Sequence, residues 1–272
     1  MSVSEVVGSA LSKAKTVYEM LQSRGEATRR LGRGEFGDIT MMADLMCEEA
    51  IISEVMKGLG SERVTIVAEE SGIKEWSGRP DYVIVVDPID GSTNMKRGLR
   101  YVSSGVAVAT GENFGDVIAA GVLDFTSGEL YLATEEEVRL PTDSGLSKVK
   151  DVKDAIMMVD FRAVKRGAES ANRYLRLIRE AKHVRNLGSS LLELVQISIG
   201  RIDAYVCLTK EMRVFDIVPA MYVISRLGCP LWSEGIGVER LPLITRERYS
   251  LIASANRDLH TAILDLLVLP RD

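Results

Sequence analysis

The sequence predicts a layered protein with an α+β N-terminal half and an α/β C-terminal half. Two observations support this prediction. In the first half, two helical patterns of apolar residues come before a series of short strand patterns, whereas strand and helix patterns alternate in the second half. The chain has 272 residues, a length that predicts one or two domains, and its 46% hydrophobic content is typical of a globular protein.

Apolar residues at helical spacing predict a first helix over 3–21, with Gly25 as its stop, and a second helix over 41–59. The glycine-rich segment 31–37 between them predicts a turn or a short hairpin. Runs of β-branched and apolar residues then predict strands over 64–68, 82–86, 102–109, 117–123 and 129–133.

A polar stretch around 141–150 predicts the junction between two domains, 1–145 and 146–272. Beyond it the patterns predict strands over 155–160, 204–208 and 249–253. They also predict helices over 171–181, 190–199, 217–227 and 258–267.

Composition excludes several kinds of site. The chain has 34 Lys and Arg against 39 Asp and Glu, so its net charge is −5, and it has only two histidines and three cysteines. A three-histidine zinc site and a four-cysteine metal site are therefore impossible. The odd number of widely spaced cysteines argues against a disulfide framework and favours a reducing, cytoplasmic compartment. Neither a signal peptide nor a membrane span is expected, and the acidic balance argues against nucleic acid as a partner.

The most specific motif is the octet 87–94, Asp-Pro-Ile-Asp-Gly-Ser-Thr-Asn, which directly follows the apolar run 82–86. We expect the strand to deliver Asp87 to its carboxyl end, where open α/β sheets bind ligands, and Pro88 to end that strand. Asp90 is close enough in sequence to share a cation with Asp87, and Gly91 lets the backbone approach a ligand. The octet therefore predicts carboxylate ligands for a divalent cation beside a phosphate-binding turn.

Other acids could join this motif. Glu69 ends the preceding strand pattern, so its carboxylate lies beside Asp87 if the two strands are neighbours, although an exposed acid at a strand end is common. Glu70 should point the other way and is interpreted as structural.

Two further acids are compatible with local structural roles. Asp216 precedes an apolar helical pattern that contains Pro219, so it is a candidate N-cap and also a candidate metal ligand. Asp44 and Asp38 both lie near the start of the second helix, and spacing alone does not choose between them.

A basic cluster, Arg162, Lys165 and Arg166, could hold a second phosphate, but a solvated surface is the favoured interpretation. The chain has no P-loop motif and no G-x-S-x-G motif, which excludes P-loop enzymes and disfavours α/β-hydrolases.

These motifs resemble the inositol monophosphatase superfamily of magnesium-dependent, lithium-sensitive phosphatases, which includes fructose-1,6-bisphosphatases. Residues 68–71 (Ala-Glu-Glu-Ser) resemble its G-E-E-S segment, and residues 87–94 match its D-P-[IL]-D-G-[ST]-x-N signature. Residues 215–216, followed by an apolar helix, resemble its W-D-x-A-A segment, and residues 37–44 resemble its D-L-V-T-x-x-D segment. The resemblance spans about residues 30–230 and implies the α-β-α-β-α sugar-phosphatase fold.

The resemblance also implies residue roles. Two or three Mg²⁺ ions would be bound by Glu69, Asp87, the carbonyl of Ile89, Asp90 and Asp216. Phosphate and substrate contacts would come from Asp90, Gly91, Ser92, Thr93, Gly188, Ser189, Ser190 and Asp216. Catalysis would use Glu69 together with a Ser92–Asp44 pair that orients the attacking water, so the resemblance selects Asp44 over Asp38.

The implied function is Mg²⁺-dependent hydrolysis of a sugar or polyol phosphate monoester by metal-activated water, in a homodimer or a higher homo-oligomer. Ser92, Phe215 and Pro219 replace the threonine, tryptophan and alanine usual in inositol monophosphatases, and Thr209 replaces a glutamate that contacts inositol. A dual enzyme acting on fructose 1,6-bisphosphate and inositol 1-phosphate therefore fits at least as well as an inositol-only enzyme. The alternatives are a 3′(2′),5′-bisphosphate nucleotidase and a catalytically silent relative that binds a metabolite or a protein.

Overall fold

A computed structural model describes residues 1–37, 39–166 and 168–270 of the chain. Asp38 lies outside the described residues, and so do the side chains of residues 163, 165–170 and 209, including those of Lys165, Arg166 and Thr209.

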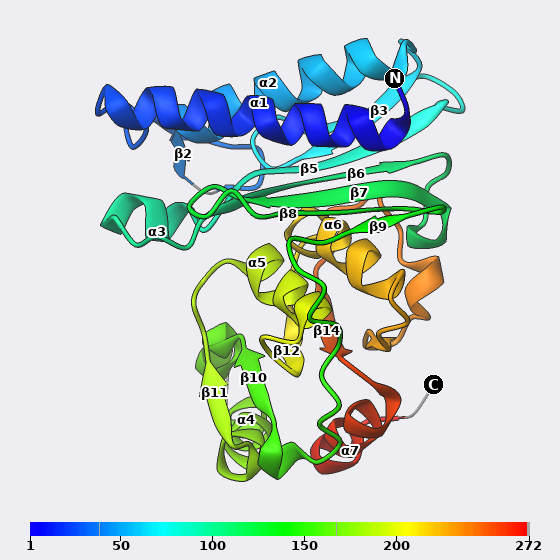
Figure 1. Ribbon diagram of the computed structural model, residues 1–272. Helices are drawn as coiled ribbons and strands as arrows, with labels where there is room; N and C mark the ends of the chain where they lie inside the picture. The colour runs from blue at the N-terminus through cyan, green and yellow to red at the C-terminus, as the bar shows by residue number, and fades with distance from the viewer. Residues whose placement is uncertain (38, 167, 271–272) are drawn as a thin grey trace.

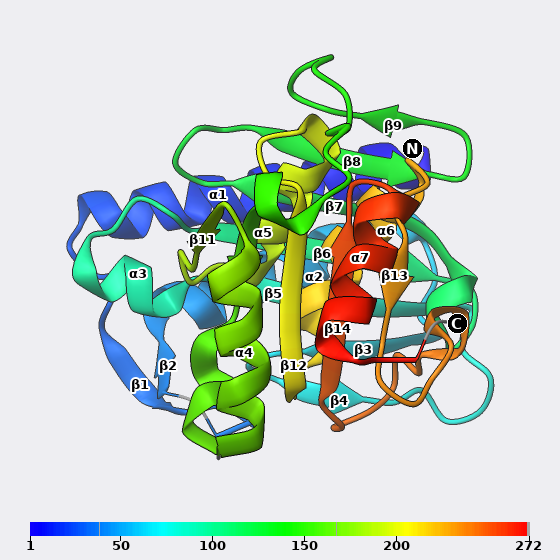
Figure 2. The same ribbon diagram turned by 90° about the horizontal axis from the view of Figure 1, so that it is seen from below.

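The chain folds into five layers (Figure 1), as the sequence predicts. Helices α1 (Val3–Ser23) and α2 (Met42–Leu59) cover the outer face of a seven-stranded sheet. Helices α5 (Ser190–Val195) and α6 (Val214–Ser225) lie between this sheet and a five-stranded sheet. Helices α4 (Ala168–Glu180) and α7 (Arg257–Leu267) cover the far face of the second sheet (Figure 2).

The first sheet has the strand order β4-β3-β5-β6-β7-β8-β9. Its strands are β3 (Val64–Ala68), β4 (Gly72–Lys74), β5 (Tyr82–Asp90), β6 (Ser103–Ala109), β7 (Val117–Asp124), β8 (Leu130–Thr134) and β9 (Val138–Arg139). Strands β3 and β5 are parallel neighbours. The prediction that Pro88 ends its strand is wrong, because β5 continues to Asp90. The pairing of β5 with β6 instead shifts register between Asp87 and Asp90.

The second sheet has the order β11-β10-β12-β14-β13. Its strands are β10 (Ile156–Val159), β11 (His183–Arg185), β12 (Ala204–Met212), β13 (Leu231–Trp232) and β14 (Tyr249–Ser254). Between Arg139 and Val152, where the polar stretch lies, the chain has no helix or strand. A glycine-rich hairpin of β1 (Arg30–Arg33) and β2 (Ile39–Met41) and the short helix α3 (Ser92–Arg97) complete the part of the fold that surrounds the site.

Helix α6 begins three residues before the predicted start at 217, because its first turn is buried between the two sheets and packs there. Asp216 is consequently the third residue of the helix and not its N-cap, which is Arg213. Pro219 lies inside the helix and not in its first turn. Within the described ranges, no helix is long and apolar enough to cross a lipid bilayer.

Candidate active site

Five predicted acids lie around one cavity of about 500 Å³. The parallel pairing of Ala68 with Val86 carries the next residues, Glu69 and Asp87, to the same edge of the first sheet. Asp90 ends β5, while Asp44 comes from the first turn of α2 and Asp216 from the first turn of α6. The cavity is lined by Ile39, Asp44, Glu69, Glu70, Asp87, Ile89, Asp90, Gly91, Ser92, Thr93, Asn94, Lys96, Asp160, Arg162, Asn186, Gly188, Ser190, Glu193, Arg213 and Asp216.

Asp87 is the most poorly satisfied of these acids. Its side chain is buried, and its Oδ1 has no hydrogen-bond partner among the residues that the structure describes. Burial raises the pKa of Asp87 well above its usual value, and the charges of Glu69, Asp90 and Asp216 raise it further. An unpaired carboxylate oxygen among like charges indicates a position that needs a cation.

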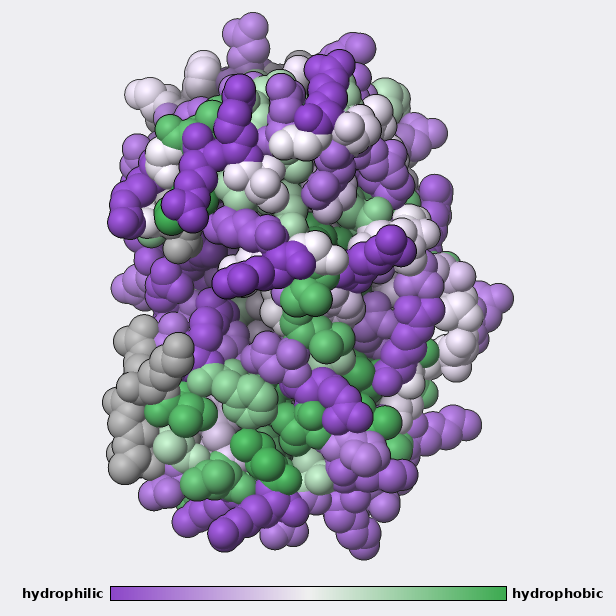
Figure 3. Space-filling model, turned by 90° about the vertical axis from the view of Figure 1, so that its left-hand side faces the viewer, coloured by the Kyte–Doolittle hydropathy of each residue, from purple (hydrophilic) through white to green (hydrophobic). Residues whose placement is uncertain are grey.

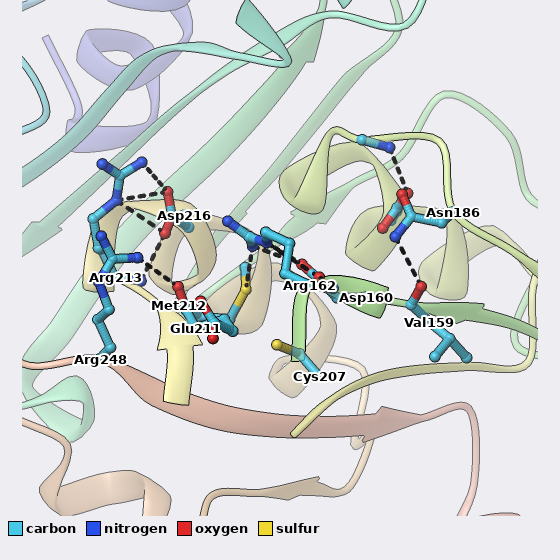
Figure 4. Close-up of polar contacts among 12 residues, drawn as sticks. Val159, Asp160, Arg162, Asn186, Cys207, Glu211, Met212, Arg213, Asp216 and Arg248 are labelled. Atoms are coloured by element: carbon cyan, nitrogen blue, oxygen red, sulfur yellow. Dashed lines mark hydrogen bonds and ion pairs between the residues drawn. The ribbon is translucent and has the colours of Figure 1, made fainter. Parts of the chain in front are cut away.

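Arg213, which the sequence reasoning missed, supplies part of that positive charge. Its Nη2 donates to Glu69 Oε1 at 2.8 Å and to Asp216 Oδ1 at 3.0 Å, and its Nε lies 3.2 Å from Asp216 Oδ2. Its backbone N–H also donates to Asp216 Oδ2 at 2.6 Å. Figure 4 shows the guanidinium directed at Asp216. The sequence does contain one signal for Arg213. It lies three residues before Asp216, a spacing at which a basic and an acidic side chain can pair at the start of a helix.

Among the residues that the structure describes, no three Asp, Glu, His or Cys side chains converge closely enough to hold a metal ion. Glu69 and Asp216 both bond to the Arg213 guanidinium. The donor set nevertheless fits a hard divalent cation, because it consists of carboxylate oxygens, one of them unpaired, and has a backbone carbonyl, that of Ile89, beside it. The Arg213 guanidinium places a positive charge between the buried carboxylates of Glu69 and Asp216.

Asp90 is held by the second half of the chain. Its Oδ2 accepts hydrogen bonds from Ser189 Oγ and from the Leu191 backbone N–H, both at 2.7 Å. Burial raises the pKa of Asp90 to about 6, although these two bonds oppose the shift. Ser189 is completely buried and does not line the cavity, so it positions Asp90, in contrast to the substrate contact predicted for it.

Ser92 and Asp44 form the pair that the resemblance implies. The Ser92 hydroxyl lies 3.1 Å from Asp44 Oδ1 and 2.9 Å from the carbonyl oxygen of Ile89, and it can donate to either. The second Asp44 oxygen accepts the Met41 backbone N–H at 2.9 Å, which fixes the carboxylate. Burial raises the pKa of Asp44 to about 6. The pair holds the Ser92 oxygen at the cavity wall with a lone pair available to a water molecule.

Gly91 shapes the turn that carries Ser92. Its φ of +95° lies in the region that favours glycine, and an added Cβ would lie 2.8 Å from the carbonyl oxygen of Tyr101. The turn therefore requires glycine, and together with Thr93 it lines the cavity.

Two neighbouring charges lie closer to the cavity than expected. Glu70 lines the cavity, but its carboxylate accepts the Thr40 hydroxyl and its backbone N–H donates to Glu48 at 2.7 Å, which agrees with its interpretation as structural. Arg162 lies on the cavity wall and not on a purely solvated surface, because Asp160 binds its guanidinium.

Glu193 was not predicted either. Its buried carboxylate accepts the backbone N–H groups of Leu187 and Gly188, so it fixes the loop that contributes Gly188 to the cavity. Burial raises the pKa of Glu193 to about 7. It follows the start of α5 on an apolar run, a position where sequence alone indicates only an amphipathic helix.

Comparison with known proteins identifies the fold and the family. The sequence model of the inositol monophosphatase family matches residues 2–268. The chain belongs to the inositol monophosphatase family. It is therefore a phosphoric monoester hydrolase of the inositol monophosphatase and fructose-1,6-bisphosphatase type.

Three relatives illustrate this membership. A fructose-1,6-bisphosphatase/inositol-1-monophosphatase of Methanothermobacter thermautotrophicus is 28% identical, over 86% of this chain and 85% of that protein. A bifunctional NADP phosphatase/NAD kinase of Methanocaldococcus jannaschii is 27% identical, over 86% of this chain and 45% of that protein. The structure of the extragenic suppressor protein SuhB from Bartonella henselae superposes with a TM-score of 0.79 at 18% identity, covering 98% of each chain. The SuhB superposition shows a shared fold.

Proposed function

We propose that this phosphatase hydrolyses a phosphate monoester of a sugar or polyol, such as fructose 1,6-bisphosphate or inositol 1-phosphate, and that it requires two or three Mg²⁺ ions. The observation that carries the proposal is the unpaired Asp87 Oδ1 within a set of buried carboxylates. Glu69, Asp87, Asp90, Asp216 and the Ile89 carbonyl would hold the ions. Bound Mg²⁺ supplies charge neutralisation for phosphoryl oxygens and lowers the pKa of water.

The protein groups would position the reactants. Gly91, Ser92 and Thr93 would contact the phosphate, because all three line the cavity beside Asp90. The Ser92 oxygen would accept a hydrogen bond from the attacking water and so orient it, because its own hydroxyl can donate to Asp44. Glu69, on the same edge, would fix the other side of that water. Gly188 and Ser190 would contact the substrate from the second half of the chain.

Phosphate release from both compounds, with Mg²⁺ and with EDTA, tests the activity. We expect release only with Mg²⁺, and we expect Asp87→Asn to abolish turnover while the far-ultraviolet circular dichroism is retained. Asp81→Asn is the matched control, since Asp81 is an exposed acid paired with Arg63 outside the cavity. An Asp87→Asn enzyme that keeps most of its activity would show that the carboxylate set is not the reaction centre.

A nucleotide phosphate is the second candidate substrate. It is favoured by the NADP phosphatase/NAD kinase relative, whose matching part covers 86% of this chain. A panel of fructose 1,6-bisphosphate, inositol 1-phosphate, adenosine 3′,5′-bisphosphate and NADP⁺ separates the candidates by kcat/KM. Release from none of them with Mg²⁺ present would favour a silent, binding relative.

The proposed assembly is a homodimer in the cytoplasm. Apolar side chains gather on the lower part of the face in Figure 3, and Leu175 and Ile178 of α4 and Leu187 after the edge strand β11 are exposed. Light scattering should give about twice the chain mass of 29.9 kDa, and Leu175→Glu should lower it. The three cysteines are buried free thiols, which supports a reducing compartment.

A further inference from the structure

The position of Glu69 depends on the short turn 69–71 at the edge of the first sheet. This turn joins the antiparallel strands β3 and β4, which pair through Ala68 and Gly72. Backbone N–H groups within the turn lie beyond the ladder of the two strands and need acceptors from elsewhere. The group that accepts them therefore also sets where the Glu69 side chain begins.

Glu48 of α2 accepts two successive N–H groups of this turn. Its Oε2 accepts the Glu70 backbone N–H at 2.7 Å, and its Oε1 accepts the Ser71 backbone N–H at 2.9 Å. The Glu48 side chain is buried, so water does not compete for these bonds. Burial raises the pKa of Glu48, but the two N–H bonds lower it and favour the ionised carboxylate.

The hairpin of β1 and β2 contacts the same turn from the side of the cavity. The Glu35 backbone N–H donates to the carbonyl oxygen of Glu70 at 3.2 Å, and the Thr40 hydroxyl donates to the Glu70 carboxylate. Strand β1 of this hairpin is exposed along its length, whereas α2 is a helix of 18 residues with a buried face against the first sheet. Glu48 is therefore the more rigid of the two supports.

Helix α2 also fixes this turn relative to the phosphate-binding turn. Asp44 and Glu48 lie four residues apart, so they share one face of the helix. Asp44 bonds to Ser92 after β5, while Glu48 holds the turn after β3. Since β3 and β5 are parallel neighbours, both turns lie at the same edge of the sheet, and one helix face holds both.

The contact requires a carboxylate. A glutamine in place of Glu48 would offer one acceptor oxygen, and its NH₂ group would point donor hydrogens at the second N–H. A buried N–H without an acceptor is costly, so the turn would shift to relieve it. Glu48 does not line the cavity, so an effect of this substitution on the site would act through the turn.

We propose that Glu48 is a positioning residue of the active site, which fixes the Glu69 carboxylate beside Asp87 by holding the backbone of residues 70 and 71. This inference rests on the proposed function, because it assumes that Glu69 and Asp87 bind Mg²⁺. Glu48 itself contacts neither the ion nor the substrate.

Glu48→Gln tests this role by calorimetric titration with Mg²⁺ and by steady-state kinetics. Loss of a group that orients a metal ligand typically costs 10–100-fold in affinity, so the Mg²⁺ dissociation constant should rise by about that factor. At saturating Mg²⁺, the KM for inositol 1-phosphate should stay within about twofold, since the turn 91–93 is held by Asp44 and not by Glu48. General loosening of the fold would change both quantities.

A double-mutant cycle shows whether Glu48 acts through Glu69. Glu69→Gln alone should weaken Mg²⁺ binding, and adding Glu48→Gln should then weaken it little further, because the ligand that Glu48 positions is already lost. Fully additive effects would show that Glu48 acts by another route and would overturn the inference.

The matched control is Asp124→Asn. Asp124 is also a buried carboxylate, and it accepts the N–H groups of Thr126 and Ser127 in the turn after β7 of the same sheet, outside the cavity. It should leave the Mg²⁺ affinity unchanged, even if the melting temperature falls. Glu48→Asp keeps the charge but is one methylene shorter. It should also weaken Mg²⁺ binding, so it serves if the glutamine variant does not fold.

A Glu48→Gln protein that binds Mg²⁺ as tightly as the wild type would overturn the inference and leave the proposed function intact. If the wild-type protein binds no Mg²⁺, the proposed function fails, and a crystal structure of Glu48→Gln then tests the positioning directly. A shifted turn 69–71 with loss of the Glu69–Arg213 ion pair would support the role of Glu48, whereas an unmoved turn would overturn it.

Discussion

Arg213→Met removes the guanidinium that lies against Glu69 and Asp216 and keeps an unbranched side chain in its place. The wild-type side chain is only 11% exposed, so this is a buried charge pair. Removing one partner of such a pair costs about 3–5 kcal/mol, because the remaining charges stay buried without compensation. Without metal, the variant should therefore unfold at a temperature about 6–20 °C lower than the wild type.

Mg²⁺ should reverse much of this loss. The ion would have to displace the guanidinium from Glu69 and Asp216 in the wild-type protein, whereas in the variant it would meet free carboxylates. If about 3 kcal/mol of competition is removed, the Mg²⁺ affinity of the variant rises about a hundredfold. Calorimetric titration with Mg²⁺ measures the affinity, and melting curves in EDTA and in saturating Mg²⁺ measure the stability.

Arg201→Met is the control for this experiment, since its exposed pair with Glu129 should contribute no more than about 1 kcal/mol. The reasoning is refuted if Arg213→Met melts earlier in EDTA but binds Mg²⁺ no more tightly than the wild type. Arg213 would then stabilise the fold without competing for the site of the ion.

Three further predictions concern the same cavity. Ser92→Ala should lower kcat about 10²–10⁴-fold while changing the Mg²⁺ affinity little, because Ser92 orients water; kinetics and calorimetry on the same sample check this, and an unchanged kcat excludes the role. Burial raises the pKa of Glu193 to about 7, so its contribution to stability is complete below pH 4.5 and is lost as the pH rises through 7. Glu193→Gln keeps the acceptor oxygen and should reduce the loss of unfolding free energy between pH 4.5 and 7 by about 3 kcal/mol, as measured by chemical unfolding. The same pH dependence in the variant and the wild type would contradict the raised pKa of Glu193. Adding Mg²⁺ to chelator-treated protein should raise its melting temperature, and identical melting with and without Mg²⁺ would show that no ion binds to the folded state.

The sequence was sufficient to single out Glu69, Asp87, Asp90 and Asp216, because these acids follow strand patterns or precede an apolar helical pattern. The run 64–68 and the run 82–90 are neighbours in one sheet, and this pairing places Glu69 beside Asp87. Family resemblance was needed to choose Asp44 over Asp38, because spacing on a helix does not show which acid a serine 48 residues away will meet.

The residues that hold these acids could not be predicted in the same way. Arg213 contacts Glu69 only because α6 packs against the first sheet, and neither Arg213 nor Asp160 belongs to a motif. Ser189 looked like a substrate contact, yet tertiary packing buries it under Asp90. The predicted start of α6 at 217 is three residues late. Its first turn is stabilised by burial between the two sheets and by the Asp216 carboxylate, which accepts the Arg213 backbone N–H.

The Asp90 carboxylate accepts the Leu191 backbone N–H, and the Glu69 carboxylate pairs with Arg213. Both partners come much later in the chain, which has a consequence for the order of folding. Synthesis delivers the acidic edge of the first sheet early, while Arg213 follows Asp90 by 213 minus 90, or 123 residues. A nascent chain that ends before α5 therefore carries like charges with neither the arginine nor the Leu191 N–H to hold them. The acidic edge is completed late, and a divalent cation present during synthesis would stabilise it sooner.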